Sequence, residues 1–146
     1  MLLTFATELD DDPARTHHLM SAKKLLIVTA LVEAPVGLLL LTAPGVVVGL
    51  LLGAPIAEPV TPVLARIAGA ALLALGVASW TAREEGASRA GRGLIAALLL
   101  YNAVAVAVLA GAGAGQGLAG ILMWPTVALH AGLALWCSSL LSGGRR

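Results

Sequence analysis

The sequence predicts an all-α protein, an integral membrane four-helix bundle with both termini in the cytoplasm. Composition gives the class, because a chain of 146 residues that is 59% hydrophobic and 12% charged has too little polar surface to cover a water-soluble globule. Length gives the spans, because four apolar segments are long enough to cross a bilayer as helices. These lie within a transmembrane domain of residues 25–141, at about residues 25–41, 63–82, 94–110 and 118–141.

Positive charge sets the predicted orientation. Lys23 and Lys24 precede the first span, three arginines lie between the second and third spans, and a basic tail of residues 142–146 follows the fourth. The other two connections carry no Lys or Arg outside the spans. The positive-inside rule therefore places both termini and the middle loop in the cytoplasm.

Residues 1–24 are expected to form a mobile cytoplasmic tail. Acidic residues around Asp11 make this stretch a poor secretory signal, because such a signal needs a positive start followed directly by its apolar core. Met20 is an alternative start to Met1, since the two lysines before the first span would then form a short positive leader.

The first span carries one carboxylate, Glu33, near its middle. An acid at that depth costs a few kcal/mol unless a neighbour pairs with it or it takes up a proton. The span ends at a breaker that contains Pro44 and Gly45. The segment after it, VVVGLLLGAP, is too short to cross the bilayer and too apolar for water. It is expected to be an interfacial or re-entrant helix, or a bent continuation of the first span.

The later spans carry few polar residues. Arg66 lies near the start of the second span, Tyr101 and Asn102 lie in the third, and His130 lies in the fourth. GAGAGQG, residues 111–117, is expected to be a flexible link, and Pro125 is expected to kink the fourth span. Small residues in these spans predict close helix packing, within the chain or in a homodimer. They are Gly69, Ala70, Ala74, Gly76, Ala78, Ala103, Ala107, Gly111, Ala128 and Gly132.

Three of the polar residues share one depth. At ~1.5 Å per residue, Glu33 and Asn102 lie ~12 Å and His130 ~15 Å from the inner ends of their helices. Such an intramembrane polar layer is typical of proton relays and of polar ligand sites. The candidate ligand-binding or proton-relay residues are therefore Glu33, Arg66, Tyr101, Asn102 and His130.

The pairing inside this layer is open. His130 is a candidate hydrogen-bond partner for Glu33, and Tyr101 either pairs with Asn102 or faces lipid headgroups. Arg66 enters from the opposite side, so it either reaches Glu33, extends to the outer surface or pairs with a loop carboxylate, Glu58. Each polar residue also has a purely structural reading, since buried polar groups need partners in any case.

Two stretches together resemble a known family. They are LLLLTAPGVVVGLLLGAP and, in the second span, LARIAGAALLALGVASW. Their order is similar to that in the DoxX-like superfamily of small four-helix membrane proteins. This resemblance implies a bundle in a bacterial inner membrane, similar to subunits of some quinone-linked systems, with Arg66 at the position of the arginine that opens the second helix.

A narrower resemblance concerns TALVEAPVG in the first span. It is similar to the first helix of the small multidrug resistance transporters, in which the acid exchanges protons for cationic drugs. The chain departs from that family in three ways. Its third span lacks the glycine-rich packing motif, its first connection is longer, and its charge bias fixes one orientation.

Two functions follow as hypotheses. The favoured one is a binding or accessory module, for a quinone-like lipophilic ligand or for a larger membrane complex, and the alternative is a proton-coupled transporter that uses Glu33. A net charge of +1 without a basic aromatic patch excludes nucleic acid as a partner. No catalytic or metal-binding residue is assigned, so a non-enzymatic role is favoured. Haem is disfavoured, because His130 offers a single axial ligand.

Overall fold

The protein is built from helices alone in the part of the chain that the computed structural model describes, residues 13–56 and 59–143. Four of the five helices are long and apolar enough to cross a membrane, which confirms the prediction of an all-α membrane protein with four spanning segments. The helices are α2 (Pro13–Thr42), α3 (Pro44–Leu52), α4 (Val60–Thr81), α5 (Arg89–Gln116) and α6 (Met123–Gly143).

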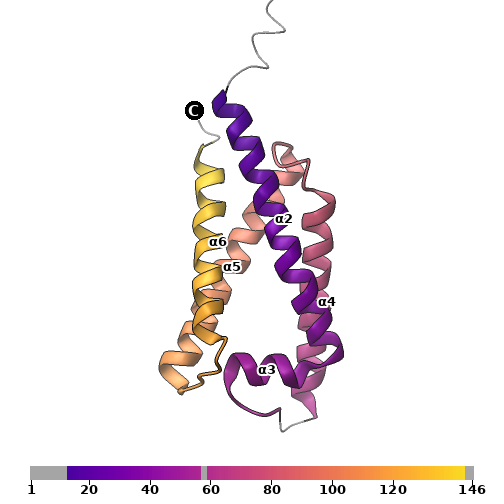
Figure 1. Cartoon of the computed structure of the whole chain (residues 1–146), viewed down its shortest axis with the longest axis vertical. Helices are drawn as coiled ribbons and strands as arrows, with labels where there is room; N and C mark the ends of the chain where they lie inside the picture. Colours follow the sequence, from indigo (N-terminus) through magenta and orange to yellow (C-terminus); the bar gives the residue numbers. More distant parts are fainter. Residues whose placement is uncertain (1–12, 57–58, 144–146) are drawn as a thin grey trace, which may run out of the picture.

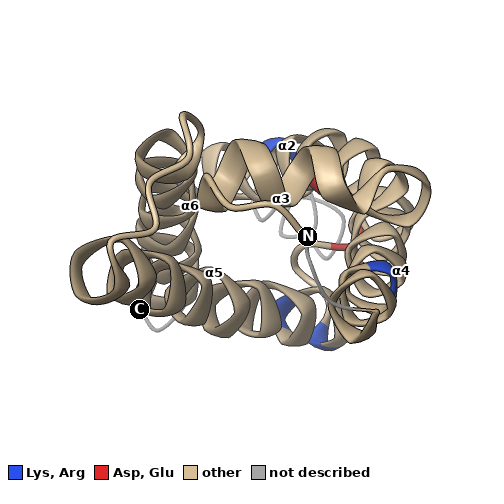
Figure 2. Ribbon diagram, turned by 90° about the horizontal axis from the view of Figure 1, so that it is seen from below, with Lys and Arg blue, Asp and Glu red and all other residues tan. Residues whose placement is uncertain are grey.

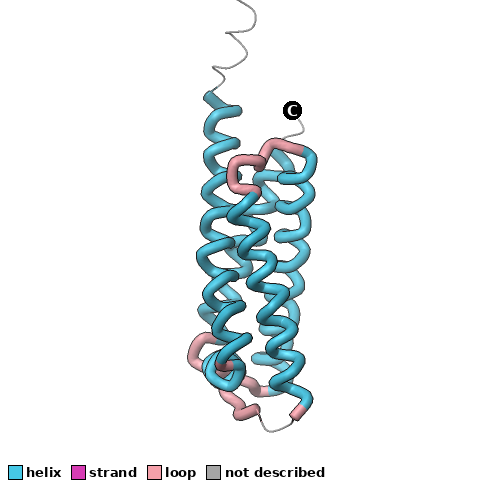
Figure 3. The backbone as a smooth tube through the Cα atoms, turned by 90° about the vertical axis from the view of Figure 1, so that its right-hand side faces the viewer, coloured by secondary structure: helices cyan, strands magenta, loops and turns pink. Residues whose placement is uncertain are grey.

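The four long helices run side by side, and the short α3 lies across one end of them (Figures 1 and 3). Seen along the bundle they form a ring, with α2 beside α4 and α5 beside α6 (Figure 2). The most extensive packing is within these two pairs, whereas α2 touches α6 over a smaller area and α3 touches α2, α4 and α6. The molecule is thus two helix pairs joined along one side.

Most of the charged residues in the described ranges belong to the start of α2, the α4–α5 loop and the start of α5, at the end away from α3, which we call the charged end. Lys23 of α2 forms a 2.7 Å ion pair with Glu84 in the α4–α5 loop. The guanidinium of Arg83 lies 4.5 Å from the ring centre of Trp80. The start of α2, the α4–α5 loop and the end of α6 all lie at this end (Figure 1).

The core lies toward the charged end, where α2, α5 and α6 meet. Its side chains are almost all aliphatic and lie fully inside the bundle. Burying them stabilises the packing of the two helix pairs through close van der Waals contact. The members are Ala22, Leu25, Leu26, Ile95, Leu98, Leu133, Cys137 and Leu140.

Glycine allows α2 and α4 to approach closely. A Cβ on Gly37 would lie 2.5 Å from the backbone nitrogen of Leu73, and a Cβ on Gly69 would lie 2.7 Å from the carbonyl oxygen of Gly37. Gly76 makes a similar contact with Ala34. No side chain larger than hydrogen fits at these positions without moving a backbone, so the glycines set the distance between the two helices.

Four helix boundaries differ from the expected ones. α5 starts at Arg89, five residues before the expected start of the third span. Residues 13–24, expected in the tail, form the first turns of α2, which starts with a proline at its first position, where the missing N–H costs nothing. Residues 111–116, expected as a flexible link, continue α5, because alanine alternates there with glycine until Gly117 adopts a left-handed conformation (φ 67°). α6 begins at Met123 rather than at residue 118.

The expected kink at Pro125 is also wrong. Pro125 lies in the first turn of α6, where backbone N–H groups have no partner within the helix, so it removes no hydrogen bond. A proline does lie in the interior of a helix at Pro35, in α2. It leaves the carbonyl of Leu31 without its usual N–H donor, two residues before Glu33.

Candidate functional site

A cavity of about 540 Å³ lies between the two helix pairs and under α3. Its volume falls in the range of roughly 300–1,000 Å³ that is usual for small-molecule sites. Of its 21 lining residues, 17 are Val, Leu or Ala and four are polar. The polar residues are Glu33, Tyr101, Thr126 and His130. A hydrocarbon ligand with a small polar group matches such a wall.

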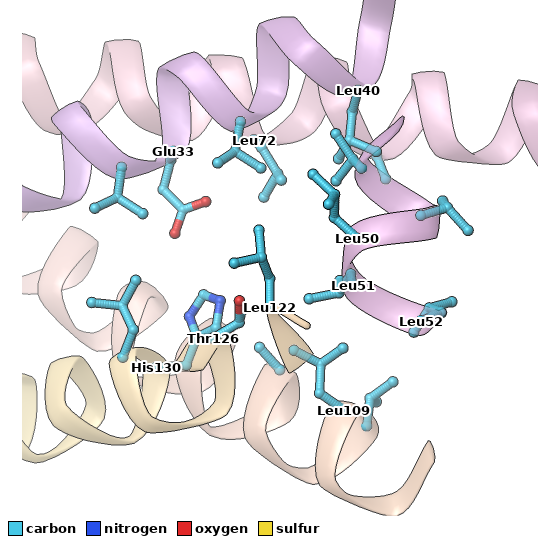
Figure 4. Close-up of a pocket in the computed structure, with 18 of the residues that line it drawn as sticks. Glu33, Leu40, Leu50, Leu51, Leu52, Leu72, Leu109, Leu122, Thr126 and His130 are labelled. Atoms are coloured by element: carbon cyan, nitrogen blue, oxygen red, sulfur yellow. The ribbon is translucent and has the colours of Figure 1, made fainter. Parts of the chain in front are cut away.

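The helix ends close the cavity at its α3 end. Leu50 accepts a hydrogen bond through its carbonyl oxygen from the backbone N–H of Leu122, at 2.9 Å. Gly120 lies so close to Leu51 that a Cβ would come within 2.6 Å of its carbonyl oxygen. These contacts fix α3 against the start of α6, and the leucines of α3 form the end wall (Figure 4).

Glu33 holds the polar end of the cavity, nearer the charged end. Its side chain is only 2% exposed, and it extends from α2 toward the His130 ring on α6 (Figure 4). Oε2 accepts a hydrogen bond of 3.2 Å from the Tyr101 hydroxyl. Oε1 is buried with no hydrogen-bond partner among the described residues. The carboxyl group therefore retains a free hydrogen-bonding atom at the cavity wall.

His130 is held by Asn102. The Asn102 amide nitrogen donates to the carbonyl oxygen of Leu98 at 2.7 Å, so its oxygen Oδ1 faces the ring, 2.7 Å from Nδ1. A carbonyl oxygen only accepts, which assigns the proton to Nδ1 and leaves Nε2 of a neutral ring as an acceptor. The Tyr101 ring stands edge-on to the imidazole, with centroids 5.5 Å apart, and helps to fix its plane.

The structure brings together four of the five candidate residues but pairs them differently from the hypotheses. His130 bonds to Asn102 rather than to Glu33, and Tyr101 bonds to Glu33 rather than to Asn102. The two neighbours on α5 project about 100° apart around the helix, so each reaches a different partner. Asn102 does not line the cavity itself, and it acts on the site through His130.

Arg66 is not part of this site. It is exposed, and its Nε donates to the carbonyl oxygen of Leu41 at 3.2 Å, in the last turn of α2. The final carbonyls of a helix lack partners within the helix, which explains this contact. Of the alternatives left open by the sequence, the reach toward Glu33 is not observed. The other expected partner, Glu58, lies outside the described residues.

Several residues that line the cavity could not be identified from the sequence. Thr126 lies four residues before His130, one helical turn away, and that spacing was the available signal. The α3 leucines carry no polar marker, so nothing in their sequence identifies them as a cavity wall.

Two buried hydroxyls outside the cavity, Thr29 and Ser79, have no hydrogen-bond partner within the part of the chain described.

Comparisons with known proteins gave no relative. A scan against protein-family models found no match, and searches of curated proteins and of solved structures also found none. Within the described residues, no group of three or more His, Cys, Asp or Glu side chains lies close enough together to hold a metal ion.

Proposed function

We propose that this membrane protein binds a lipophilic ligand in the cavity between its two helix pairs. One observation carries the proposal, namely a cavity of about 540 Å³ with an aliphatic wall and a buried, half-satisfied carboxyl group at one end. A hydrocarbon body gains van der Waals contacts with the wall, while a polar group on the ligand satisfies Glu33 Oε1. A quinone-like molecule is one member of this class.

The proposed setting is a bacterial inner membrane, as the DoxX-like resemblance implies, with the charged end in the cytoplasm. An accessory role in a larger membrane complex belongs to the same proposal. Small residues of α5 that the sequence marks for packing, Ala103, Ala107 and Gly111, are exposed on this chain. Faces of this kind let another helix approach closely.

The experiment is native mass spectrometry of the protein released gently from its own membranes. We expect an extra retained mass on the wild type, and its identity gives the ligand or the partner subunit. Two matched substitutions on α5 test the place of binding. Ala105 lines the cavity and Ala103 is exposed outside it, so Ala105→Phe should lose a small-molecule mass that Ala103→Phe keeps.

Two results would contradict the proposal. One is a bare protein in every preparation, and the other is an equal retained mass on both phenylalanine variants. A retained protein subunit without a small molecule would favour the accessory role alone.

A second candidate, proton-coupled transport, is supported by the free Oε1 of Glu33 at the cavity wall. A carboxyl group that binds either a proton or a substrate couples the two. The expected result is that Glu33→Asp shifts the pH dependence of substrate uptake into vesicles. Uptake that is unchanged at every pH would dispose of this candidate.

A further inference from the structure

We infer that the ligand is a long-chain alcohol, an amphiphile with a hydroxyl head group at Glu33 and His130 and one flexible aliphatic chain along the cavity. This inference rests on the proposed function and deepens it. It is carried by the free hydrogen-bonding atoms at the polar end and by the kinds of side chain along the rest of the wall.

The head group follows from what the polar end offers. Glu33 Oε1 has no partner among the described residues; it accepts a hydrogen bond when the carboxyl is ionised and carries the donated proton when it is neutral. His130 is already bound through Nδ1, which leaves Nε2 as an acceptor. A hydroxyl has one donor and also accepts. With a neutral Glu33 it accepts the carboxyl proton and donates to the imidazole, and with an ionised Glu33 it donates to Oε1.

Other head groups match less well. A carbonyl or an ether only accepts, so it leaves Nε2 unpaired, and a quaternary ammonium has no hydrogen to donate. A primary ammonium has donors, but its charge needs an ionised Glu33. No Lys, Arg or second acid lines the cavity in the described structure, and 17 of its 21 lining residues are aliphatic. In such surroundings the desolvation of both charges offsets their attraction, whereas a neutral hydroxyl avoids that cost.

The body of the ligand follows from the rest of the wall. Beyond the polar end it consists mostly of branched aliphatic side chains, and all five described helices contribute to it (Figure 4). No Phe or Trp is among the lining residues, and the two rings that are, Tyr101 and His130, stand edge-on to each other. With only two aromatic rings in a wall that is otherwise almost all aliphatic, a planar ligand gains little from stacking, whereas a flexible chain can follow the irregular wall.

The test is competition against a photoreactive dodecanol that carries a diazirine in its chain. The full-length protein is placed in lipid nanodiscs, and labelling is measured by intact mass and by peptide mapping. The competitors share one chain and differ in the head group: 1-dodecanol, dodecyl methyl ether and dodecylamine. We expect labelling of cavity-lining peptides, with dodecanol competing at a concentration about tenfold lower than the ether, as one lost hydrogen bond implies.

Variants separate the head-group chemistry from the cavity. Glu33→Gln keeps a donor and an acceptor but cannot ionise, so it should keep the preference for the alcohol. Glu33→Leu combined with His130→Leu removes both polar partners, so the double variant should abolish the preference and leave the chain bound. Equal competition by alcohol and ether on the wild type would overturn the hydroxyl inference and leave the proposed function standing. If dodecylamine competes best and loses its advantage in Glu33→Gln, the hydroxyl inference is likewise overturned and the proposed function stands. Labelling that no competitor reduces, or that Ala105→Phe leaves intact, would overturn the proposed function itself.

Discussion

At the scale of single residues, Asn102 organises the site without lining it. Its amide spans from the Leu98 carbonyl to the His130 ring, with both hydrogen bonds 2.7 Å long. The side chain is 1% exposed, so water does not compete for either bond. Removing Asn102 would leave the imidazole free to rotate or to change its protonated nitrogen. This residue therefore determines which atom of His130 faces the cavity.

A double-mutant cycle tests this bond. We expect Asn102→Ala and His130→Ala each to lower the free energy of unfolding by about 1–2 kcal/mol, and the double variant to lose less than their sum by about 1 kcal/mol. The measurement is reversible unfolding in mixed micelles, followed by tryptophan fluorescence. Tyr101→Phe serves as the control, since it keeps the ring beside His130 and removes only the hydroxyl. Additive losses from Asn102 and His130 would show that the two side chains are not coupled.

The sequence predicts the depth of the polar residues but not their partners. Counting residues along each span placed Glu33, Asn102 and His130 in one layer, because the rise of a helix is fixed. The partners depend on how far each helix is rotated about its axis. Apolar residues surround all of these positions in sequence, so no polar stripe indicates the rotation. For that reason only the structure shows that Tyr101 pairs with Glu33 and Asn102 with His130.

At the scale of elements, the contact between α2 and α4 is a seam of backbone on backbone. Gly37 faces Gly69 and Leu73 across it, and Gly76 faces Ala34. The sequence marks Gly69 and Gly76 as packing residues, and both are buried. Other marked positions serve no contact inside the chain, since a Cβ on Gly111 or Gly132 would meet nothing within 4 Å. Spacing alone does not say which side of a helix meets its neighbour.

Glycine substitutions test the seam. Gly37→Ala places a methyl group 2.5 Å from the Leu73 backbone nitrogen, so we expect α2 and α4 to move apart and the free energy of unfolding to fall by about 1–3 kcal/mol. Gly111→Ala makes the same chemical change in an open position and should leave stability unchanged or slightly higher. Thermal unfolding in detergent compares the two variants. An equal loss of stability in both variants would show that the close contact between α2 and α4 does not depend on Gly37.

At the scale of the whole molecule, the bundle is asymmetric along its length. The charged end is packed by the core of α2, α5 and α6, and the other half holds the cavity under α3. Composition and run length predicted the four spans, because a spanning helix must be long and apolar. The cavity was beyond such reasoning. It arises where helices far apart in the chain fail to touch, and a wall of Val and Leu reads in sequence like any lipid-facing surface.

The orientation of this asymmetric bundle is the last prediction, and it decides from which side a proton or a ligand would reach Glu33. The positive-inside rule places the charged end in the cytoplasm, because Lys23 and Lys24 in α2, Arg83 in the α4–α5 loop, and Arg89 and Arg92 at the start of α5 resist translocation. Two exposed alanines at opposite ends give a matched test, Ala87 in that loop and Ala119 between α5 and α6.

In intact cells, a membrane-impermeant maleimide should label Ala119→Cys at once and Ala87→Cys only after the membrane is permeabilised. The native Cys137 is buried at 0% exposure, so it adds little background, and the unsubstituted protein measures what remains. The reverse pattern would place the charged end outside. In that case Glu33 would lie nearer the outer surface than α3 does, and any proton it exchanges would come from the opposite compartment.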